Sequence, residues 1–227
     1  MCTSIVSNRE KTIVGWNLDI LDMSYRVRTE KRGVFIEIFD PKEGWLPLFG
    51  ANSRGDFVGM PTCWPYDQRS DKKGEGSSII MLGIDLLLQK KTMKEIYEIS
   101  TSSPVYSENG VTFMSAMSDK DGNVLYIVPG QGTKYLERPE YSVLTNFSPF
   151  KGETEKHPWA GFDRYAKANE MLKNAAEDFG VEDCFKVLKS VSQEVCPTVV
   201  SMVFDVGERT VYWCERREWN DVRSAKL

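Results

Sequence analysis

Cys2 directly follows the initiator Met1, and this position gives it two groups that can take part in nucleophilic catalysis. If Met1 is removed, as methionine aminopeptidases do before small residues, the thiol of Cys2 lies beside its own free α-amine. The amine has a pKa of roughly 7.7–8.0 and the thiol a pKa of roughly 8.5, so the amine can accept the thiol proton near neutral pH, directly or through one water. One residue then supplies nucleophile and base, as in enzymes with an amino-terminal threonine. Cys2 is therefore a candidate nucleophile for acyl transfer.

His157 is the single histidine of the chain and offers an alternative base. A hydrolase with a Ser/Cys–His–Asp triad needs an imidazole to accept the proton of the nucleophile. His157 stands in the polar segment EKHPW, which is more typical of a surface loop. With one histidine and no CxxC pair, no metal is expected. The phosphate-binding patterns GxxxxGK[ST] and GxGxxG are also absent, so no cofactor is expected.

The composition predicts an ordinary globular protein, with 227 residues, 41% hydrophobic residues and a net charge of −4. Its 29 basic and 33 acidic residues are well mixed, which disfavours binding to nucleic acid or to an anionic membrane. No apolar run approaches the roughly 20 residues of a membrane helix, and none precedes Arg9 as a signal peptide would require. Five widely spaced cysteines fit free thiols in a reducing compartment, so we expect a cytoplasmic protein.

Alternating apolar residues and turn signals predict strands that pair as hairpins. These segments are 3–7 with 12–16, 34–39, 50–61 with a turn at Arg54-Gly55, the two sides of DKDG at 119–122, and the two sides of 206–209 near the carboxyl end. Because hairpins join antiparallel strands, we expect antiparallel sheets rather than a parallel βαβ sheet.

Helices are predicted in three segments. The sequence TMKE at 92–95 is a capping box, and a helix should follow it to about Ser100. A second apolar stripe runs from Phe162 to Phe179 and ends at Gly180, and a third occupies VEDCFKVLKSVSQ at 181–193. The fold class is therefore α+β in a single domain over 1–227, with a charged, Gly/Ser-rich flexible loop at 67–78.

Several short motifs, in the same order along the chain, resemble the choloylglycine hydrolase / penicillin V acylase family of N-terminal nucleophile (Ntn) hydrolases. They are MCTS at 1–4, GWNLD at 15–19, GANSRGDFVGMPT at 50–62, MSDKDGNVLYI at 117–127, VLTNF at 143–147, FDRYAKA at 162–168 and TVVSMVFDVGERTVYWCE at 198–215. The resemblance implies a four-layer αββα sandwich in which two antiparallel sheets are stacked between helices.

The resemblance also implies roles for individual residues. Cys2 would be the nucleophile and, through its amine, the base, and Asp19 would accept a hydrogen bond from that amine. Asn146 would donate its side-chain N–H to the oxyanion of the tetrahedral intermediate. Arg164 would lie near Cys2 and Asp19 and favour the thiolate, and a backbone N–H at Thr62 would be a second oxyanion donor.

Trp16 is a departure from this family, which usually has an arginine at the corresponding position. A guanidinium lowers the pKa of a nearby thiol and orients a carboxylate, and an indole can do neither. Trp16 could instead form an apolar wall. We expect the substrate pocket to be lined by Trp16, Asn17, Trp64 and Phe147, although the aromatic members could equally belong to the core.

These features favour an amidase that cleaves a linear, non-peptide amide of an N-acyl compound, similar to penicillin V or a bile salt, through a thioester. Three alternatives remain open: acyl transfer to a second amine, an inactive homologue that binds a small molecule, and a hydrolase that depends on His157. The expected partner is a small-molecule amide, with no nucleic acid and no membrane, and the sequence is compatible with a homo-oligomer.

Overall fold

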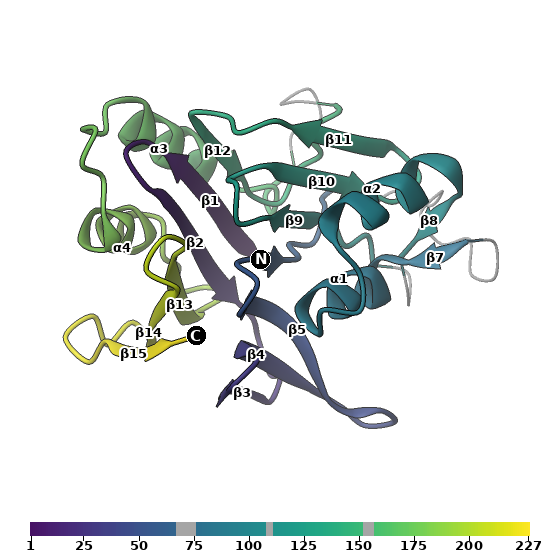
Figure 1. Ribbon diagram of the computed structural model, residues 1–227, viewed down its shortest axis with the longest axis horizontal. Coiled ribbons are helices and arrows are strands. Elements are labelled where there is room, and N and C mark those ends of the chain that lie inside the picture. Colours follow the sequence, from purple (N-terminus) through teal and green to yellow (C-terminus); the bar gives the residue numbers. More distant parts are fainter. Residues whose placement is uncertain (67–75, 108–110, 152–156) are drawn as a thin grey trace.

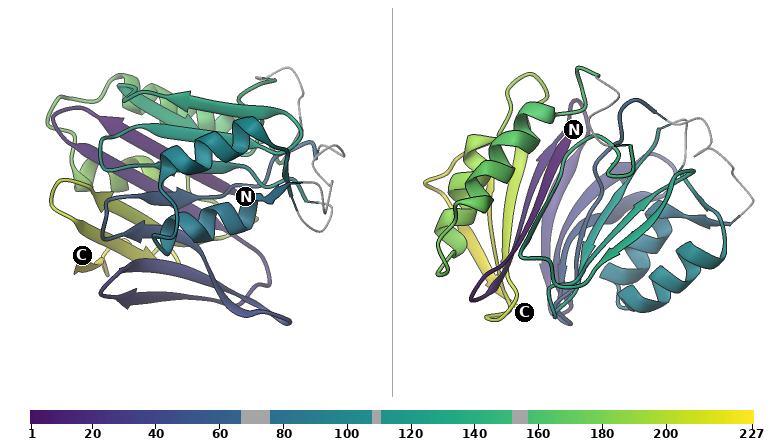
Figure 2. Two further views of the ribbon diagram at one scale, coloured as in Figure 1. Left: turned by 45° about the vertical axis from the view of Figure 1, so that its right-hand side comes forward. Right: turned by 90° about the horizontal axis from the view of Figure 1, so that it is seen from above.

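Two antiparallel sheets are stacked face to face, and helices cover the outer face of each sheet (Figure 1). The computed structural model describes residues 1–66, 76–107, 111–151 and 157–227. Seen from above, the layers follow one another as helices, sheet, sheet and helices (Figure 2). The α+β class and the two stacked antiparallel sheets predicted from the sequence are confirmed.

The first sheet has six strands in the order β12-β1-β2-β13-β14-β15, and all its neighbours are antiparallel. Its strands are β1 (Cys2–Asn8), β2 (Thr12–Asp19), β12 (Tyr141–Leu144), β13 (Thr198–Asp205), β14 (Thr210–Glu215) and β15 (Arg223–Lys226). The amino-terminal hairpin β1–β2 thus lies inside this sheet, between two segments that are distant in the sequence.

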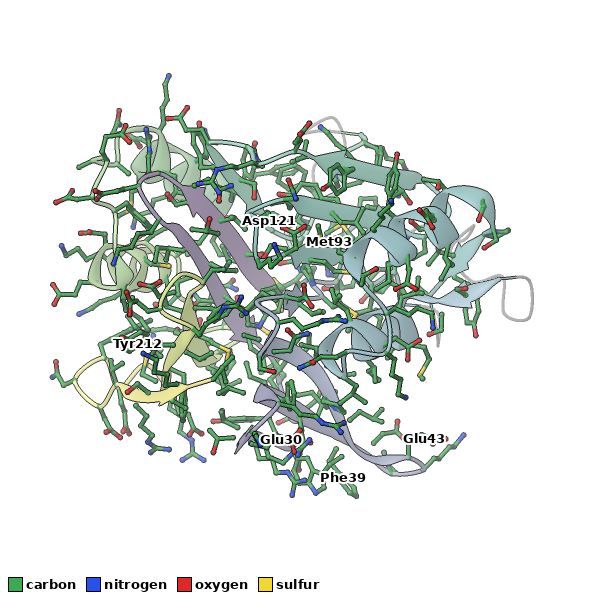
Figure 3. The ribbon with its side chains drawn as sticks, in the orientation of Figure 1. Glu30, Phe39, Glu43, Met93, Asp121 and Tyr212 are labelled. Carbon is green, nitrogen blue, oxygen red and sulfur yellow. The ribbon has the colours of Figure 1, made fainter. Side chains whose placement is uncertain are left out.

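The second sheet has seven strands in the order β11-β10-β9-β6-β5-β4-β3. Its strands are β3 (Tyr25–Glu30), β4 (Gly33–Asp40), β5 (Gly44–Asn52), β6 (Phe57–Gly59), β9 (Ser115–Ser118), β10 (Val124–Val128) and β11 (Gly132–Leu136). The β4–β5 hairpin extends to one end of the sandwich, where Phe39 and Glu43 are exposed (Figure 3).

The helices are α1 (Ile79–Leu87), α2 (Met93–Ser102), α3 (Phe162–Lys173) and α4 (Val181–Ser190). Local sequence signals predicted where α2, α3 and α4 begin. The predicted capping box forms, since the Thr92 hydroxyl accepts the Glu95 backbone N–H and the Glu95 carboxylate accepts the Thr92 backbone N–H. Helices α1 and α2 pack on the second sheet, and α3 and α4 pack on the first (Figure 2).

Helix α3 is shorter than the sequence predicts. It ends at Lys173, where the Asn174 backbone N–H donates to the carbonyls of Glu170 and Leu172, and the residues up to Gly180 form turns. Phe179 is buried in the cluster between the helices and the first sheet without being helical. The helical spacing of Phe179 therefore predicted its burial correctly and the length of the helix incorrectly.

The predicted loop at 67–78 lies mostly outside the described residues. From its described end, β7 (Ser77–Ser78) pairs in parallel with β8 (Val105–Tyr106) as a two-stranded sheet, and the Ser78 side chain caps α1. Within the part of the chain that the structure describes, no helix is long and apolar enough to cross a membrane.

Strand alternation separates two kinds of interior. From β2, Val14, Trp16 and Leu18 belong to the large apolar core between the two sheets. Ile13 belongs to a smaller core between the first sheet and helices α3 and α4. Because β1 and β2 are buried on both faces, their ends can hold side chains away from water on either side of the sheet.

Candidate active site

Cys2 begins β1 in the middle of the first sheet. Cys2 pairs with Leu18 of β2, and the backbone N–H of Asp19 donates to the Met1 carbonyl at 2.9 Å. The terminal amine of Met1 donates to the Asp19 carbonyl at 2.6 Å and approaches the Cys196 sulfur at 3.8 Å. Met1 therefore extends the β1–β2 pairing by one residue, and the Cys2 nitrogen is a peptide nitrogen in this chain.

Asn146 is the side chain that binds the Cys2 nitrogen. The Cys2 N–H donates to Asn146 Oδ1 at 2.9 Å, and Asn146 Nδ2 donates to the Thr62 carbonyl at 2.6 Å and to its hydroxyl at 3.1 Å. The backbone of Asn146 is held by hydrogen bonds with Ala160 and Trp64. The amide is thus oriented with its oxygen toward Cys2 and its nitrogen toward Thr62.

This arrangement bears on the predicted oxyanion donors. The N–H groups of Asn146 point at Thr62, so a substrate oxyanion would have to displace the Thr62 hydroxyl from them. Thr62 presents its carbonyl and hydroxyl to Asn146, whereas the prediction concerned its backbone N–H. The structure brings the two predicted oxyanion residues together, but the Asn146 donors are occupied by Thr62 itself.

Arg164 reaches the site from the first turn of α3. One guanidinium nitrogen donates to the Cys2 carbonyl at 2.7 Å and to the Thr3 hydroxyl at 2.8 Å, and the other donates to Asn146 Oδ1 at 2.8 Å. The nearest distance to the Asp19 carboxylate is 3.7 Å. This buried cation therefore connects β1, the segment after β12 and the end of β2.

Gly161 allows Arg164 to adopt this position. It precedes α3 with a left-handed φ of 73°, and a Cβ there would lie 2.2 Å from a guanidinium nitrogen of Arg164. A residue with a side chain would meet both backbone strain and this clash. Sequence reasoning did not select Gly161, although a glycine just before an apolar helical stripe is a recognisable signal.

The Asp19 carboxylate is fully buried. Thr198 Oγ1 donates to Asp19 Oδ1 at 2.7 Å, and Gln193 Nε2 donates to Asp19 Oδ2. Burial raises the pKa of Asp19 from 3.8 to about 6, opposed by Arg164, by these two donors and by the amino terminus. The carboxylate accepts no hydrogen bond from the Met1 amine, which binds the Asp19 main-chain carbonyl instead.

The Cys2 thiol is protonated at neutral pH in this state. Burial raises its pKa to about 11, because a thiolate loses solvation there, and the Asp19 charge acts in the same direction. The amino terminus, the Asp19 backbone N–H and Arg164 all act to lower the pKa. For the amine of Met1, burial lowers the pKa, but the nearby Cys2, Cys196 and Asp19 raise it overall.

Two of the residues predicted to line the substrate pocket are fully buried. Trp16 is fully buried between the sheets, stacked on Phe49 at 5.3 Å, and its ring leaves no room for a Cβ at Gly59. Asn17 projects to the other face of β2, where it donates to the Leu188 carbonyl and accepts from the Ser201 hydroxyl. Strand alternation explains why Trp16 and Asn17 point in opposite directions, because neighbours on a strand face opposite sides.

Trp64 and Phe147 do line cavities. A small cavity of about 10 Å³, close to the size of one water, is bordered by both rings. Phe147 also lines a groove of about 300 Å³, whose walls combine apolar residues such as Leu144 with polar ones such as Lys134 and Asn169. Cys2 is 4% exposed and lines neither this cavity nor this groove.

His157 contacts two tryptophans. Its ring stacks on Trp64 at 4.8 Å, and its Nδ1 accepts the backbone N–H of Trp159. All five cysteines lie in the described part of the chain and are buried. Among the described residues, no group of three or more His, Cys, Asp or Glu side chains could hold a metal ion.

The structure resembles those of several amide-cleaving enzymes. A mutant (C2A) conjugated bile acid hydrolase from Clostridium perfringens superposes with a TM-score of 0.67, at 13% identity, over 100% of this chain and 92% of that chain. An N-acylethanolamine-hydrolyzing acid amidase ortholog from Caenorhabditis elegans superposes with a TM-score of 0.63, at 17% identity, over 91% and 93%. Penicillin V acylase from Agrobacterium tumefaciens gives 0.62, at 14% identity, over 95% and 83%.

At these identities the likeness establishes a shared fold. It confirms, at that level, the resemblance to the choloylglycine hydrolase / penicillin V acylase family that the motifs predicted. No family model matches the sequence, and no curated protein matches it.

Proposed function

We propose that this chain is an amidase with an amino-terminal cysteine nucleophile, acting on a linear, non-peptide amide. The observation that carries the proposal is the convergence of Cys2, Asp19, Asn146 and Arg164 from four separate segments on the amino terminus. All four side chains are buried, which is a demanding arrangement for polar groups and is typical of functional sites. Chains with this fold include a bile acid hydrolase, an acid amidase and a penicillin V acylase.

The proposed reaction begins after Met1 is removed. The Cys2 nitrogen then becomes an α-amine that already donates to Asn146 Oδ1. This amine takes the thiol proton, and the thiolate attacks the amide carbonyl to form a tetrahedral oxyanion. The C–N bond breaks as the α-ammonium returns its proton to the leaving amine, which leaves a thioester. Water, deprotonated by the same amine, hydrolyses the thioester and frees the acid.

Asn146 is the proposed oxyanion donor, and Thr62 remains a proposed second contributor. Asn146 Nδ2 already points out of the Cys2–Arg164 cluster, toward the Thr62 hydroxyl. Substrate binding would exchange that neutral acceptor for the developing negative charge, which strengthens the hydrogen bond. Arg164 fixes the amide orientation through Asn146 Oδ1 and keeps the donor aimed the same way.

The groove of about 300 Å³ that Phe147 lines is the proposed site for the acyl part of the substrate, and its lining combines apolar and polar side chains. Its volume is at the lower end of the range for small-molecule sites, and Phe147 directly follows Asn146 in the chain. Trp64 borders the smaller cavity, which Phe147 also lines. We therefore propose an N-acyl amide whose acyl part contacts Phe147 and Trp64.

His157 is not part of the proposed mechanism. The ring nitrogen Nδ1 is used by Trp159, and the ring is stacked on Trp64. A base for Cys2 needs to lie within hydrogen-bond reach of the thiol or of one bridging water. The α-amine meets this requirement by its position in the same residue.

The first test is the state of the amino terminus and of its thiol. Intact mass spectrometry should find the chain without Met1. One equivalent of iodoacetamide at neutral pH should then label Cys2 ahead of the other thiols, with Cys184 as the internal control, because burial raises its pKa well above its usual range. Retained Met1, or labelling of Cys2 no faster than of Cys184, would contradict the proposal.

The second test is hydrolysis of penicillin V, a taurine-conjugated bile acid and an N-acylethanolamine. We expect at least one to be cleaved, with activity abolished in Cys2→Ala and retained in His157→Ala. Adding a second amine distinguishes hydrolysis from acyl transfer, because a transferase forms the new amide. Binding without turnover by the Met1-free chain would instead support an inactive homologue.

A further inference from the structure

The turn between α4 and β13 closes over the end of β2. Within this turn, the Gln193 N–H donates to Thr198 Oγ1 at 2.9 Å, and the Thr198 N–H donates to the Gln193 carbonyl at 3.1 Å. The Pro197 carbonyl accepts the Ile20 N–H at 3.3 Å. The turn is therefore stabilised by its own hydrogen bonds and is also hydrogen-bonded to Ile20, the residue that follows Asp19.

Its two polar side chains both point at Asp19. The Thr198 hydroxyl accepts from the Gln193 backbone, so its single proton is directed at Asp19 Oδ1, 2.7 Å away. The Gln193 side-chain amide donates to the other carboxylate oxygen. Each oxygen of a fully buried carboxylate thus receives one neutral donor, and two such bonds determine the direction of the carboxyl plane.

The other charged and titratable groups around Asp19 come from α3, from the start of β1 and from the same turn. Arg164 approaches from α3 to 3.7 Å, which is longer than a direct hydrogen bond. The amino terminus and the Cys2 thiol interact with the carboxylate from the start of β1. Cys196, in the same turn, meets the Met1 amine at 3.8 Å. The two neutral donors are therefore the closest contacts of the carboxylate.

We propose that Gln193 and Thr198 are positioning residues that hold the Asp19 carboxylate ionised and oriented beside the amino-terminal nitrogen. The inference rests on the proposed function, in which the nitrogen alternates between amine and ammonium. An ionised carboxylate beside it stabilises the ammonium that forms when the thiol is deprotonated. Neutral donors keep the carboxylate charged without supplying a cation that would compete with the ammonium for it.

The test is a pH titration of Asp19, monitored by NMR in the Met1-free chain labelled with ¹³C at aspartate carboxyl groups. The Asp19→Asn spectrum identifies the Asp19 signal. The variants are Thr198→Val, which removes the donor, Thr198→Ser, which keeps it, and Gln193→Leu. Two controls change neighbouring positions away from the carboxylate. Ser201→Ala removes a buried hydroxyl on β13, the strand of Thr198, that binds Asn17. Glu194→Gln changes an exposed side chain in the turn that contains Gln193.

We expect the Asp19 pKa to rise by about one pH unit in Thr198→Val and in Gln193→Leu, because each loses a hydrogen bond to the charged form. Thr198→Ser, Ser201→Ala and Glu194→Gln should titrate as the parent chain does. If Thr198→Val does not fold, the Asp19 titration in Gln193→Leu still tests whether these neutral donors lower the carboxyl pKa. Unchanged titration in Gln193→Leu and in any folded Thr198→Val chain would overturn the inference.

The activity profile separates this inference from the proposed function. If the parent chain cleaves an amide, the acidic limb of kcat/KM should move upward in pH with the Asp19 titration, while the controls keep the parent profile. A shifted titration in a chain that cleaves none of the amides would overturn the proposed function and leave the carboxylate contacts supported. An active chain with an unmoved titration and an unmoved acidic limb would overturn the positioning role alone.

Discussion

The interior between the two sheets and the polar cluster at the amino terminus share strands β1 and β2 but are stabilised differently. Between the sheets, Trp16 packs on Phe49 and on the bare backbone of Gly59, and contact area provides the stability. At the amino terminus, Asp19, Asn146 and Arg164 are equally inaccessible but are held by directed hydrogen bonds. Substitutions between the sheets should therefore lower stability and leave the chemistry unchanged, whereas changes in the polar cluster should also alter the chemistry.

The largest expected effect on stability is that of Trp16→Ala. Removing a fully buried indole should lower the free energy of unfolding by about 4 kcal/mol, and Trp16→Phe should lower it by less. Urea denaturation followed by circular dichroism measures both, with the exposed Trp159→Ala as control. If Trp16→Ala left stability intact but abolished the activity of the folded fraction, the indole would belong to the site.

Asn146→Asp should act mainly on the chemistry. The variant keeps an acceptor for the Cys2 nitrogen and for Arg164 but loses the N–H donor, so kcat should fall about 100- to 1,000-fold. Steady-state kinetics on a cleaved amide measures the loss, with Asn17→Asp, on β2 and facing α4, as a matched change. A kcat within a few-fold of the parent value would exclude Asn146 as an oxyanion donor.

Asp19 should make the protein less stable at higher pH. Its pKa is raised to about 6 in the folded chain, above its ordinary value of 3.8, so the folded state binds more protons over this interval. The Asp19 contribution is therefore complete below about pH 4 and is lost as the pH rises through about 6. Asp19→Asn removes this dependence.

We expect the free energy of unfolding of Asp19→Asn, relative to the parent, to be about 2 kcal/mol higher at pH 8 than at pH 4. Urea denaturation at both pH values measures the difference. An equal difference at both values would mean that the carboxylate is ionised as readily in the folded as in the unfolded chain.

Gly161→Ala should have the smallest of these effects on stability and the most local one. The left-handed backbone and the clash with Arg164 should together lower the free energy of unfolding by roughly 1–2 kcal/mol. Gly180→Ala is a control, because it precedes α4 without a positive φ and its Cβ would meet its nearest atom at 3.7 Å. Equal losses in both variants would show that Arg164 does not depend on Gly161.

Local patterns predicted most of the fold. The β1–β2, β9–β10 and β13–β14 hairpins, the capping box of α2 and the short helix α4 all follow from periodicity and turn residues within a few positions. Strands β3, β11, β12 and β15 and helix α1 were not predicted. Their existence depends on pairing or packing with segments distant in the sequence, which local periodicity does not report.

The sequence alone determined which residue could be the nucleophile, because a thiol next to a freed α-amine is a covalent relationship that needs no fold. It also determined the hairpins and helices that local patterns mark, since periodicity and turns are local. The tertiary structure alone decided that Asn17 binds the Leu188 carbonyl and that Gln193 and Thr198 meet Asp19. Such contacts join residues more than 170 positions apart, and they exist only once the strands have taken their register in the sheet.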